Sequence, residues 1–306
     1  LLPACFKPQR KLASGSYAEV WRVLDEEKDR VYAVKTMFPE MHDYNYFDPA
    51  EISRNAADED TLWARLVHNN IIQKFDTYVS KGYRATLMQC CNSGDLFEHM
   101  NYNFDKYASY RFAYLEDIKH IIVQIFSALD YLHNKMQMVH RDVKLENVLV
   151  HFDDEENGVD VKPGSRQIRK ARLLLADFTF LTPLDALIHS CGTRLYVAPE
   201  MLSGKKYGCA VDCWSGGIVA YECLEGVHPF ITENEEEEIS TTKQNLAIVN
   251  GKMRAFKRTE KNEIVVEIIK SLLNRNSNER MTAHQVLEQC DKKESKRRTF
   301  FKRWTT

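Results

Sequence analysis

Residues 140–147 read HRDVKLEN, and the triplet DFT begins with Asp177, thirty residues after the end of that stretch. Asp142 and Lys144 lie two residues apart, and Asn147 follows the acid by five residues. Asp177 comes directly after the apolar run LLLA. An acid, a lysine and an amide beside a second acid suit a site that deprotonates a hydroxyl while it holds a metal-bound polyphosphate. Each motif alone is weak, so the interpretation needs the remaining parts of such a site elsewhere in the chain.

The length and composition indicate an ordinary globular chain. At 306 residues it exceeds an average domain of ~150 residues, so we expect about two domains or one bilobal unit. Hydrophobic residues make up 44% and charged residues 28%, which allows a sizeable core. The net charge of −2 predicts no general attraction to nucleic acid or to a membrane surface.

The cysteines and the apolar segments favour an intracellular protein. The eight cysteines form no CxxC pair and no cluster with histidine, so we interpret them as reduced packing residues. No apolar run approaches the ~18 residues of a membrane span. Prolines interrupt the opening LLPACFKPQR, which does not resemble a signal peptide. We expect a cytoplasmic and/or nuclear monomer without nucleic-acid or membrane partners.

Residues 11–37 have the pattern of β-strands around a tight turn. Gly15 lies in a Gly/Ser turn, where the missing side chain would let backbone N–H groups approach phosphate oxygens. In RVYAVKTM the two-residue period places Ala33 and Lys35 on one face. Considered alone, these residues also fit an ordinary hairpin and a solvated strand. Two further short strands are predicted at 71–79 and 82–90.

Several later segments have helical periodicity. A helix is predicted to begin after Pro49, with Glu59 at the edge of its apolar face. Residues 115–135 carry isoleucine and leucine at helical spacing, which predicts a core helix. Further helices are predicted at 210–226, 264–273 and 283–289.

Three charged segments interrupt these patterns. Residues 151–172 predict a flexible surface insertion, because they are charged and contain Gly and Pro. The acidic run at 233–238 predicts a solvated loop. The segment 292–306 is basic with interleaved aromatic residues, so a frayed surface tail and a docking or autoregulatory element are both open.

In order along the chain, these segments resemble the eukaryotic protein kinases over roughly residues 10–290. The resemblance is carried by LASGSYAEV (12–20), AVK (33–35), HRDVKLEN, DFT, GTRLYVAPE (192–200), VDCWSGG (211–217) and NSNERMTAHQVL (276–287). It implies an α+β bilobal protein kinase fold with a small β-rich N-lobe and a larger helical C-lobe. The implied boundaries are an N-terminal extension at 1–9, the N-lobe at about 10–88, the hinge at 89–94, the C-lobe at 95–290 and a basic C-terminal tail at 291–306.

The resemblance also implies a lysine–glutamate pair in the N-lobe. Lys35 would neutralise the α- and β-phosphates of ATP, oriented by an ion pair with Glu59. Glu59 is favoured over the neighbouring Asp58 and Asp60, because Leu62, Trp63 and Leu66 then lie on the inward face of the helix.

The remaining catalytic roles fall on the opening motifs. The resemblance implies that Asp142 accepts the proton of the substrate hydroxyl and that Lys144 steadies the γ-phosphate. Asn147 and Asp177 would hold Mg²⁺, with Mn²⁺ as an alternative, through oxygen ligands. ATP and Mg²⁺ are therefore the expected cofactors.

An adenine-binding cleft between the lobes is implied in the same way. Met88 would precede the hinge, the Gln89 carbonyl and the Cys91 N–H would pair with the adenine edge, and Asp95 would contact the ribose. The full expected ATP-binding set is Leu12, Gly15, Val20, Ala33, Lys35, Met88, Gln89, Cys91, Asp95 and Leu149. Cys90 and Cys91 have no further ligand partners in the sequence, which disfavours a metal site there.

Lys144 and Thr193 resemble serine/threonine rather than tyrosine kinases, and SGDLFEHM resembles the calmodulin-dependent and checkpoint-kinase branch. The expected substrate-docking residues are Asp95, Glu146, Glu222 and Thr193. These acids would favour basic residues upstream of the Ser or Thr acceptor, although surface acids are also commonly only solvated. Protein substrates are the expected partners, with the insertion or the tail as a candidate site for a regulatory partner.

The chain departs from the family pattern at two glycine positions of the first turn, which are Ala13 and Ala18, and at Thr179. A β-branched Thr179 should restrict backbone rearrangement of its loop. Candidate activation-loop hydroxyls are Thr179, Thr182, Ser190 and Thr193. His189 stands where relatives carry an activating threonine, so we expect a loop that orders without phosphate beside Arg141, or with phosphate on Ser190. Expected structural residues are Glu200, Asp212 and Arg280.

Two other classes of function stay open at this point. A pseudokinase scaffold would bind nucleotide or partners without efficient turnover, and Thr179, Ala13 and Ala18 favour it. A small-molecule kinase of similar fold is disfavoured by GTRLYVAPE, which resembles a peptide-docking loop. An active protein serine/threonine kinase is the leading hypothesis, because all the charged residues that the chemistry needs are present.

Overall fold

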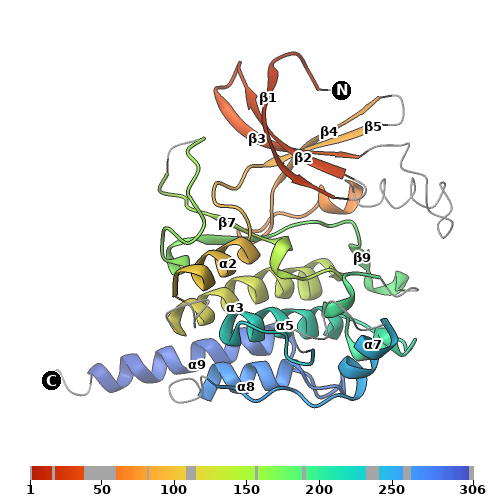
Figure 1. Ribbon diagram of the computed structural model, residues 1–306, viewed down its shortest axis with the longest axis vertical. Helices are drawn as coiled ribbons and strands as arrows, with labels where there is room; N and C mark the ends of the chain where they lie inside the picture. Colours follow the sequence, from red (N-terminus) through yellow and green to blue (C-terminus); the bar gives the residue numbers. More distant parts are fainter. Residues whose placement is uncertain are drawn as a thin grey trace.

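The computed structural model describes residues 2–15, 18–37, 60–80, 83–107, 115–155, 158–187, 191–231, 241–257 and 263–302. They form two lobes, a β-sheet N-lobe and a larger helical C-lobe that lies below it in Figure 1. The α+β bilobal architecture expected from the sequence is therefore confirmed.

The N-lobe is a five-stranded antiparallel sheet in the order β1-β2-β3-β5-β4. Its strands are β1 (Phe6–Ser14), β2 (Ala18–Asp25), β3 (Arg30–Met37), β4 (Lys74–Ser80) and β5 (Tyr83–Gln89). Alternation along β3 directs Ala33 into the core shared with the C-lobe, and Tyr32 and Val34 into a second cluster with Phe6. Residues 6–9 were expected in an extension but belong to β1, because Phe6 is buried against Tyr32.

Residues 60–63 are helical and pack beneath the sheet. Trp63 is buried and donates its indole N–H to the Ile72 carbonyl at 2.9 Å. Asp60 forms an ion pair with Lys74 at 2.9 Å, and the Lys74 side chain is only 8% exposed. A lysine at the start of β4 is therefore explained by an acid on the helix, which the sequence pattern did not reveal. The predicted helix start at Pro49 and the predicted partner Glu59 lie outside the described residues.

The C-lobe is organised around α3 (Leu115–Asp130) and α5 (Ala210–Glu225). The periodic isoleucines of α3 are buried, as the spacing predicts, and α5 packs against both α3 and α8 (Glu263–Leu272). A Cβ on Gly217 would lie 2.8 Å from the Leu272 Cβ, so glycine permits the close approach of α5 to α8. Leu224, at the end of α5, is also buried.

Smaller elements connect this core to the cleft. In the part of the chain that the structure describes, the other helices are α2 (Leu96–Tyr107), α4 (Pro199–Leu202), α7 (Thr241–Asn250) and α9 (Ala283–Lys302). The short helices there are η1 (Tyr131–Met136), η2 (Leu145–Asn147), η3 (Ile168–Lys170), η4 (Leu184–Ala186) and η5 (Arg194–Tyr196). Two short antiparallel pairs, β6 (Met138–Val139) with β9 (Thr182–Pro183) and β7 (Val148–His151) with β8 (Arg172–Leu175), support the catalytic segments. α9 continues past residue 290, so helix forms over part of the predicted tail. Among the described residues, no helix combines the length and apolarity needed to cross a membrane.

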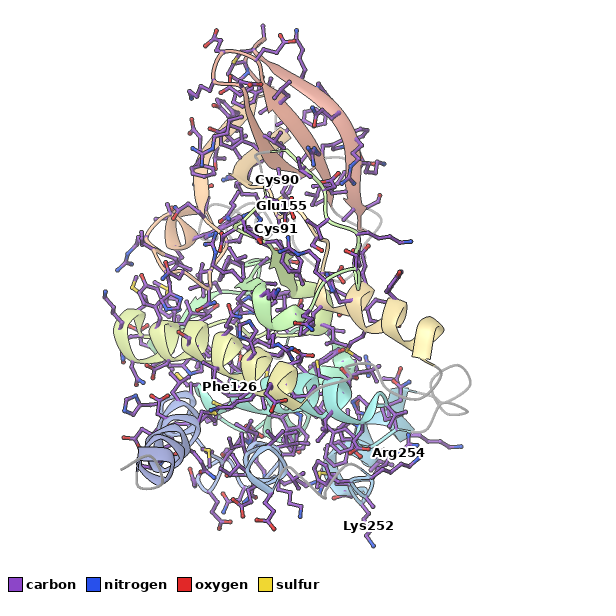
Figure 2. The ribbon with its side chains drawn as sticks, turned by 90° about the vertical axis from the view of Figure 1, so that its left-hand side faces the viewer. Cys90, Cys91, Phe126, Glu155, Lys252 and Arg254 are labelled. Atoms are coloured by element: carbon purple, nitrogen blue, oxygen red, sulfur yellow. The ribbon has the colours of Figure 1, made fainter. Side chains whose placement is uncertain are left out.

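The insertion joins β7 to β8 and packs across both lobes. Val161 is buried, and its N–H donates to the Asn92 carbonyl of the hinge at 2.7 Å. Asp160 forms ion pairs with Arg10 of β1, at 2.7 Å, and with Arg22 of β2. Figure 2 shows Glu155 of the insertion near the hinge residues Cys90 and Cys91. The described part of the insertion thus differs from the flexible surface segment that was expected. Asp160 has partners in the N-lobe, and Val161 has a partner in the hinge.

A buried ion pair stabilises the C-lobe away from the cleft. Arg280 and Glu200 form two parallel hydrogen bonds, of 2.7 and 3.0 Å, and their side chains are 0% and 7% exposed. Arg280 also donates to the carbonyls of Ala210 and Asn274 and lies over the Trp214 ring. This pair therefore joins α4 to the start of α5.

Replacement of Arg280 by alanine should destabilise the protein strongly. Removing one partner leaves the Glu200 carboxylate buried without its counter-charge, which costs about 3–5 kcal/mol. The free energy of unfolding, measured by chemical denaturation, should fall by that amount. The matched control is Lys292→Ala, which breaks an exposed pair with Glu288 and should change stability by less than about 0.5 kcal/mol. Equal losses in the two variants would contradict a special role for the buried pair.

Candidate active site

The Asp212 carboxylate shapes the turn that carries the predicted catalytic acid. It is fully buried, and its Oδ2 accepts hydrogen bonds from the His140 backbone N–H and the His133 ring at 2.8 Å each. Its Oδ1 accepts the Arg141 N–H, also at 2.8 Å. Burial would raise the pKa of Asp212, but these donors outweigh it and hold the pKa below its ordinary value. Arg141 can therefore adopt the left-handed φ of 69° that turns Asp142 toward the cleft.

Asp142 is held by donors from three directions and is 6% exposed. Its Oδ1 accepts the backbone N–H and the hydroxyl of Thr193, each at 2.8 Å. Its Oδ2 accepts Asn147 Nδ2 at 3.0 Å and lies 3.3 Å from Lys144 Nζ. Lys144 Nζ also donates to the Thr193 hydroxyl at 2.8 Å. The structure thus brings together Asp142, Lys144 and Asn147, and it adds Thr193, which the sequence assigned to docking and to the activation loop.

Asp177 lies on the opposite side of this group and pairs with the N-lobe. Its Oδ1 accepts Lys35 Nζ at 2.9 Å and the Thr179 hydroxyl at 2.7 Å. Desolvation would raise the pKa of Asp177, but the Lys35 ammonium and the Thr179 hydroxyl hold it well below its ordinary value. Asp177 has a left-handed φ of 61°, and the next residue, Phe178, is fully buried. Lys35 is therefore near the second acid, whereas its predicted partner Glu59 lies outside the described residues.

Phe178 anchors the DFT segment between the lobes. Its ring lies 5.4 Å from Trp63 and 5.2 Å from His140, measured between centroids. Trp63 belongs to the helical residues under the N-lobe sheet, and His140 begins the catalytic turn. The apolar contacts therefore connect the N-lobe helix with both predicted catalytic motifs.

The oxygen atoms near Asp142 and Asp177 fit a hard divalent cation. Asn147 Nδ2 donates to the Asp142 carbonyl at 2.8 Å and to its carboxylate, so the amide oxygen points elsewhere. Within the described residues, no hydrogen bond reaches Asn147 Oδ1 or Asp177 Oδ2, and the Asp177 side chain is 40% exposed. A carboxylate and an amide oxygen, completed by water and phosphate oxygens, are ligands of the kind that Mg²⁺ uses.

The apolar residues expected around adenine come together above these groups. Ala33 and Met88 are buried members of the large core cluster, and Leu12, Val20 and Leu149 are partly buried and pack against it. Ala33 pairs with Met88 across β3 and β5, which places both at the edge of the hinge. Gly15 donates its N–H to the Ala18 carbonyl at 2.9 Å, closing the turn between β1 and β2. The apolar residues expected around adenine therefore belong to one contiguous group beside the hinge.

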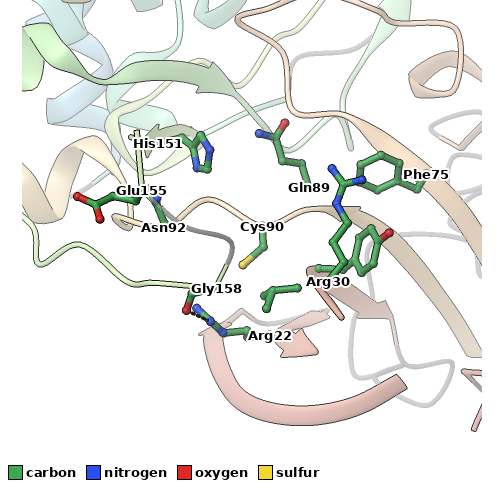
Figure 3. Close-up of a pocket in the computed structure, with 11 residues that line it drawn as sticks. Arg22, Arg30, Phe75, Gln89, Cys90, Asn92, His151, Glu155 and Gly158 are labelled. Atoms are coloured by element: carbon green, nitrogen blue, oxygen red, sulfur yellow. Dashed lines mark hydrogen bonds between the residues drawn. The ribbon is translucent and has the colours of Figure 1, made fainter. Parts of the chain in front are cut away.

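A separate hollow of about 210 Å³ lies against the hinge, as Figure 3 shows. It is lined by Arg22, Arg30, Val31, Tyr32, Phe75, Gln89, Cys90, Asn92, His151, Glu155 and Gly158. Among these lining residues only Gln89 belongs to the predicted ATP-binding set, so the hollow is distinct from the group of apolar residues expected around adenine. Burial raises the pKa of the Cys90 thiol to about 11 and that of Cys91 further, which keeps both as neutral thiols at pH 7.

Asp95, one of the predicted docking acids, lies directly before α2. Asp95 and Glu98 form reciprocal hydrogen bonds, with the Glu98 N–H donating to Asp95 Oδ1 at 2.8 Å, in the manner of a capping box. Desolvation and the charges of Glu98 and Glu146 raise the pKa of Asp95 to about 6. Glu222 accepts a hydrogen bond from the Tyr196 hydroxyl at 2.9 Å. Burial raises the pKa of Tyr196, and the negative charges of Glu222 and Glu146 raise it further. Glu98 was missed in the sequence, although its three-residue spacing from Asp95 is a known capping signal.

The first part of the activation loop is ordered around Arg141. The guanidinium donates to the Phe180 carbonyl at 2.7 Å, to the Tyr207 hydroxyl at 3.2 Å and to the Thr182 hydroxyl. Thr182 also begins β9, which pairs with β6 directly before His140. Ser190 and His189 lie outside the described residues. Tyr207 was not predicted, and no local sequence pattern connects it with Arg141, because the contact spans two separate segments.

Comparisons with known proteins agree with this geometry. A family model described as the protein kinase domain matches residues 6–290. A calcium/calmodulin-dependent protein kinase type 1 from Caenorhabditis elegans is 32% identical over 230 residues, which cover 73% of this chain and 57% of the relative. The protein of the same name from Macrobrachium nipponense is 31% identical over 228 residues, with the same shares, and that from Caenorhabditis briggsae is 34% identical over 174 residues, or 56% and 42%.

The chain spans about half the length of the curated relatives it matches. The family match covers most of the chain and includes all the segments that form the site described above. The chain therefore belongs to the protein kinase domain family.

Proposed function

We propose that this chain is an ATP-dependent protein serine/threonine kinase, which transfers the γ-phosphoryl group of ATP to Ser or Thr hydroxyls of proteins. One observation supports this most directly: Asp142 is held between Thr193 on one oxygen and Lys144 and Asn147 on the other. The names of the similar proteins, all protein kinases, point the same way.

In this proposal Asp142 accepts the proton of the acceptor hydroxyl. Its two oxygens are fixed by donors on separate segments, so the carboxylate is oriented before the substrate arrives. The Thr193 hydroxyl bridges Asp142 and Lys144, so the acid and the cation lie side by side and both would face the incoming hydroxyl. Lys144 would then lie beside the γ-phosphate and offset the negative charge that moves during transfer.

The nucleotide would lie between the lobes, beside the hinge. Val20, Ala33 and Leu149 would enclose adenine, and the backbone of Gln89 and Cys91 would pair with its edge. Lys35 would neutralise the α- and β-phosphates. Asn147 and Asp177 would hold Mg²⁺, or Mn²⁺ in its place, and the ion would offset charge on the phosphate oxygens.

We further propose that the acceptor sequence contains basic residues before the Ser or Thr. Burial raises the pKa of Asp95, and the negative charges of Glu98 and Glu146 raise it further. The local negative charge of these acids supports a site for an Arg or Lys side chain. Glu222 contributes from α5, beside Tyr196. A positional peptide library without enrichment of Arg or Lys before the acceptor would contradict this preference.

The activation loop is proposed to order without phosphate beside Arg141. The guanidinium already has a carbonyl and two hydroxyl acceptors in the unmodified chain, so a phosphate is not needed to bring the loop to it. Treatment of the purified protein with a phosphatase should leave its activity unchanged.

A regulatory partner is proposed for the basic segment 291–306. The printed names of the relatives make calmodulin a candidate, because a basic helix with aromatic residues is a common calmodulin target. Titration of the chain with calmodulin, with Ca²⁺ and with a chelator, decides this point.

A reducing, cytoplasmic or nuclear, location is proposed because all eight cysteines are free thiols.

The kinase proposal is tested by comparing the wild-type chain with Asp142→Asn. With Mg²⁺, γ-labelled ATP and a basic Ser/Thr peptide, the wild type should transfer label, and the variant should be slower by about 10²–10⁴-fold because it lacks the proton acceptor. Nucleotide binding should persist in the variant. Absence of transfer by both proteins would favour the pseudokinase scaffold, and equal transfer would remove Asp142 from the proposed role.

Gly192→Ala should disturb the support of Asp142. Gly192 has a φ of 91°, and a Cβ there would lie 2.3 Å from the Arg141 carbonyl oxygen, so the segment must shift and carry Thr193 with it. Displacement of a positioned group by ~1 Å lowers kcat by about a hundredfold. The control is Gly204→Ala, which has a φ of 66° but no atom within 4 Å of the added Cβ. A comparable fall in kcat in both variants would mean that backbone strain alone is responsible.

The binding of basic peptides should depend on pH through Asp95. Its pKa of about 6 in the folded chain lies above its ordinary value, so its ionised form is disfavoured by folding. Stability from this group is present at low pH and is lost as pH rises through about 6, and the released charge then attracts a substrate cation. The KM of an Arg-containing peptide should rise below pH 6, and Asp95→Asn should flatten that change. An unaltered pH profile in the variant would contradict this role.

A further inference from the structure

Thr179 stands where the family has glycine, and its hydroxyl joins two charged groups of the site. Its Oγ1 accepts a hydrogen bond from Lys35 Nζ at 2.9 Å. The same hydroxyl donates to Asp177 Oδ1 at 2.7 Å. A threonine hydroxyl has one hydrogen to donate, so the direction of both bonds is determined by the charges of its partners. Glycine could make neither bond.

These bonds act on one oxygen of the Asp177 carboxylate only. Oδ1 receives both Lys35 and Thr179, whereas Oδ2 has no hydrogen bond from the described residues. The hydrogen bond spans two residues along the chain and closes a local turn, in which Asp177 has a φ of 61°. Phe178, between the two bonded residues, is buried against Trp63 and His140. The orientation of the Asp177 carboxylate thus depends on the backbone conformation of Asp177 and on the hydrogen bonds to its Oδ1.

A nucleotide would change this arrangement at Lys35. In the proposed function, the Lys35 ammonium turns toward the α- and β-phosphates, and Asp177 Oδ1 then loses one of its two donors. The Thr179 hydroxyl is on the same loop as Asp177, so its bond to Asp177 Oδ1 does not require the Lys35 ammonium. It can therefore keep Oδ1 occupied while Oδ2 binds the metal.

We propose that Thr179 is a positioning residue, whose hydroxyl orients the Asp177 carboxylate for the divalent cation of the metal–nucleotide complex. The inference rests on the proposed function only in that metal and nucleotide bind at this site. It differs from a purely steric role, in which β-branching at residue 179 stiffens the loop. Valine keeps the branching without the hydroxyl, and serine keeps the hydroxyl without the branching, so the two roles can be separated.

Calorimetric titration of an ATP analogue that cannot transfer its phosphate gives a readout that does not need turnover. With Mg²⁺, Thr179→Val should bind the analogue roughly tenfold more weakly than the wild type, since a hydrogen bond to a charged, partly exposed group is lost. Thr179→Ser should retain most of the affinity. In EDTA the difference between the wild type and Thr179→Val should disappear, because Asp177 then has no metal to bind.

Two further proteins make the test specific. Thr36→Val removes a strand hydroxyl that donates to the Glu19 carbonyl at 3.1 Å. This variant controls for the loss of a threonine hydroxyl outside the DFT segment, and it should bind the analogue like the wild type. In the Asp177→Asn background, the additional change Thr179→Val should have no further effect on Mg²⁺-dependent affinity. Thermal unfolding without ligand verifies that each variant is folded.

The outcomes separate this inference from the proposed kinase activity. Equal Mg²⁺-dependent affinity of wild type and Thr179→Val, or a serine variant as weak as the valine variant, would overturn the positioning role. A loss that persists undiminished in EDTA would also overturn it, because the effect would then not act through the metal. If the wild type binds the metal–nucleotide complex with the predicted pattern but transfers no phosphate to protein, the kinase proposal fails while the role of Thr179 stands.

Discussion

The buried Asp212 carboxylate is the constraint on which the site depends. It sits on α5, at the centre of the C-lobe, and its two oxygens accept the N–H groups of His140 and Arg141 together with the His133 ring. Those bonds compensate the cost of burying a charge and hold a left-handed residue in the catalytic turn. The direction of the turn is therefore set by a buried helix, α5, as well as by the loop itself.

From this turn, the polar contacts spread to segments that are distant in sequence. Asp142 binds Thr193, fifty-one residues later, and Asp177 binds Lys35, 142 residues earlier. Phe178 connects the same region to Trp63 through ring contacts. Each contact joins a C-lobe loop to a different element, so the charged groups converge only when both lobes are folded and in contact. This explains why the same residues are uninformative when they are considered one at a time.

Much of the fold and the site follows from the sequence, and the exceptions have a common physical origin. The isoleucine spacing of α3, the alternation around Ala33 and the order of the motifs act locally, so they can be recognised along the chain. Lys74 beside Asp60, the Thr193 hydroxyl on Asp142 and the Tyr207 hydroxyl on Arg141 are tertiary contacts, and their partners are set by packing. The insertion was interpreted from its charge and its Gly and Pro content, which do not show that Asp160 meets two arginines of the sheet.

Through these ion pairs, the insertion connects the two lobes. The insertion that carries Asp160 joins β7 to β8 of the C-lobe. Asp160 forms ion pairs with Arg10 of β1 and Arg22 of β2, and the Val161 N–H donates to the hinge backbone. Rotation of the sheet away from the helices would have to break these contacts, which lie on the side of the hinge. The insertion therefore adds a second connection between the lobes beside the hinge itself.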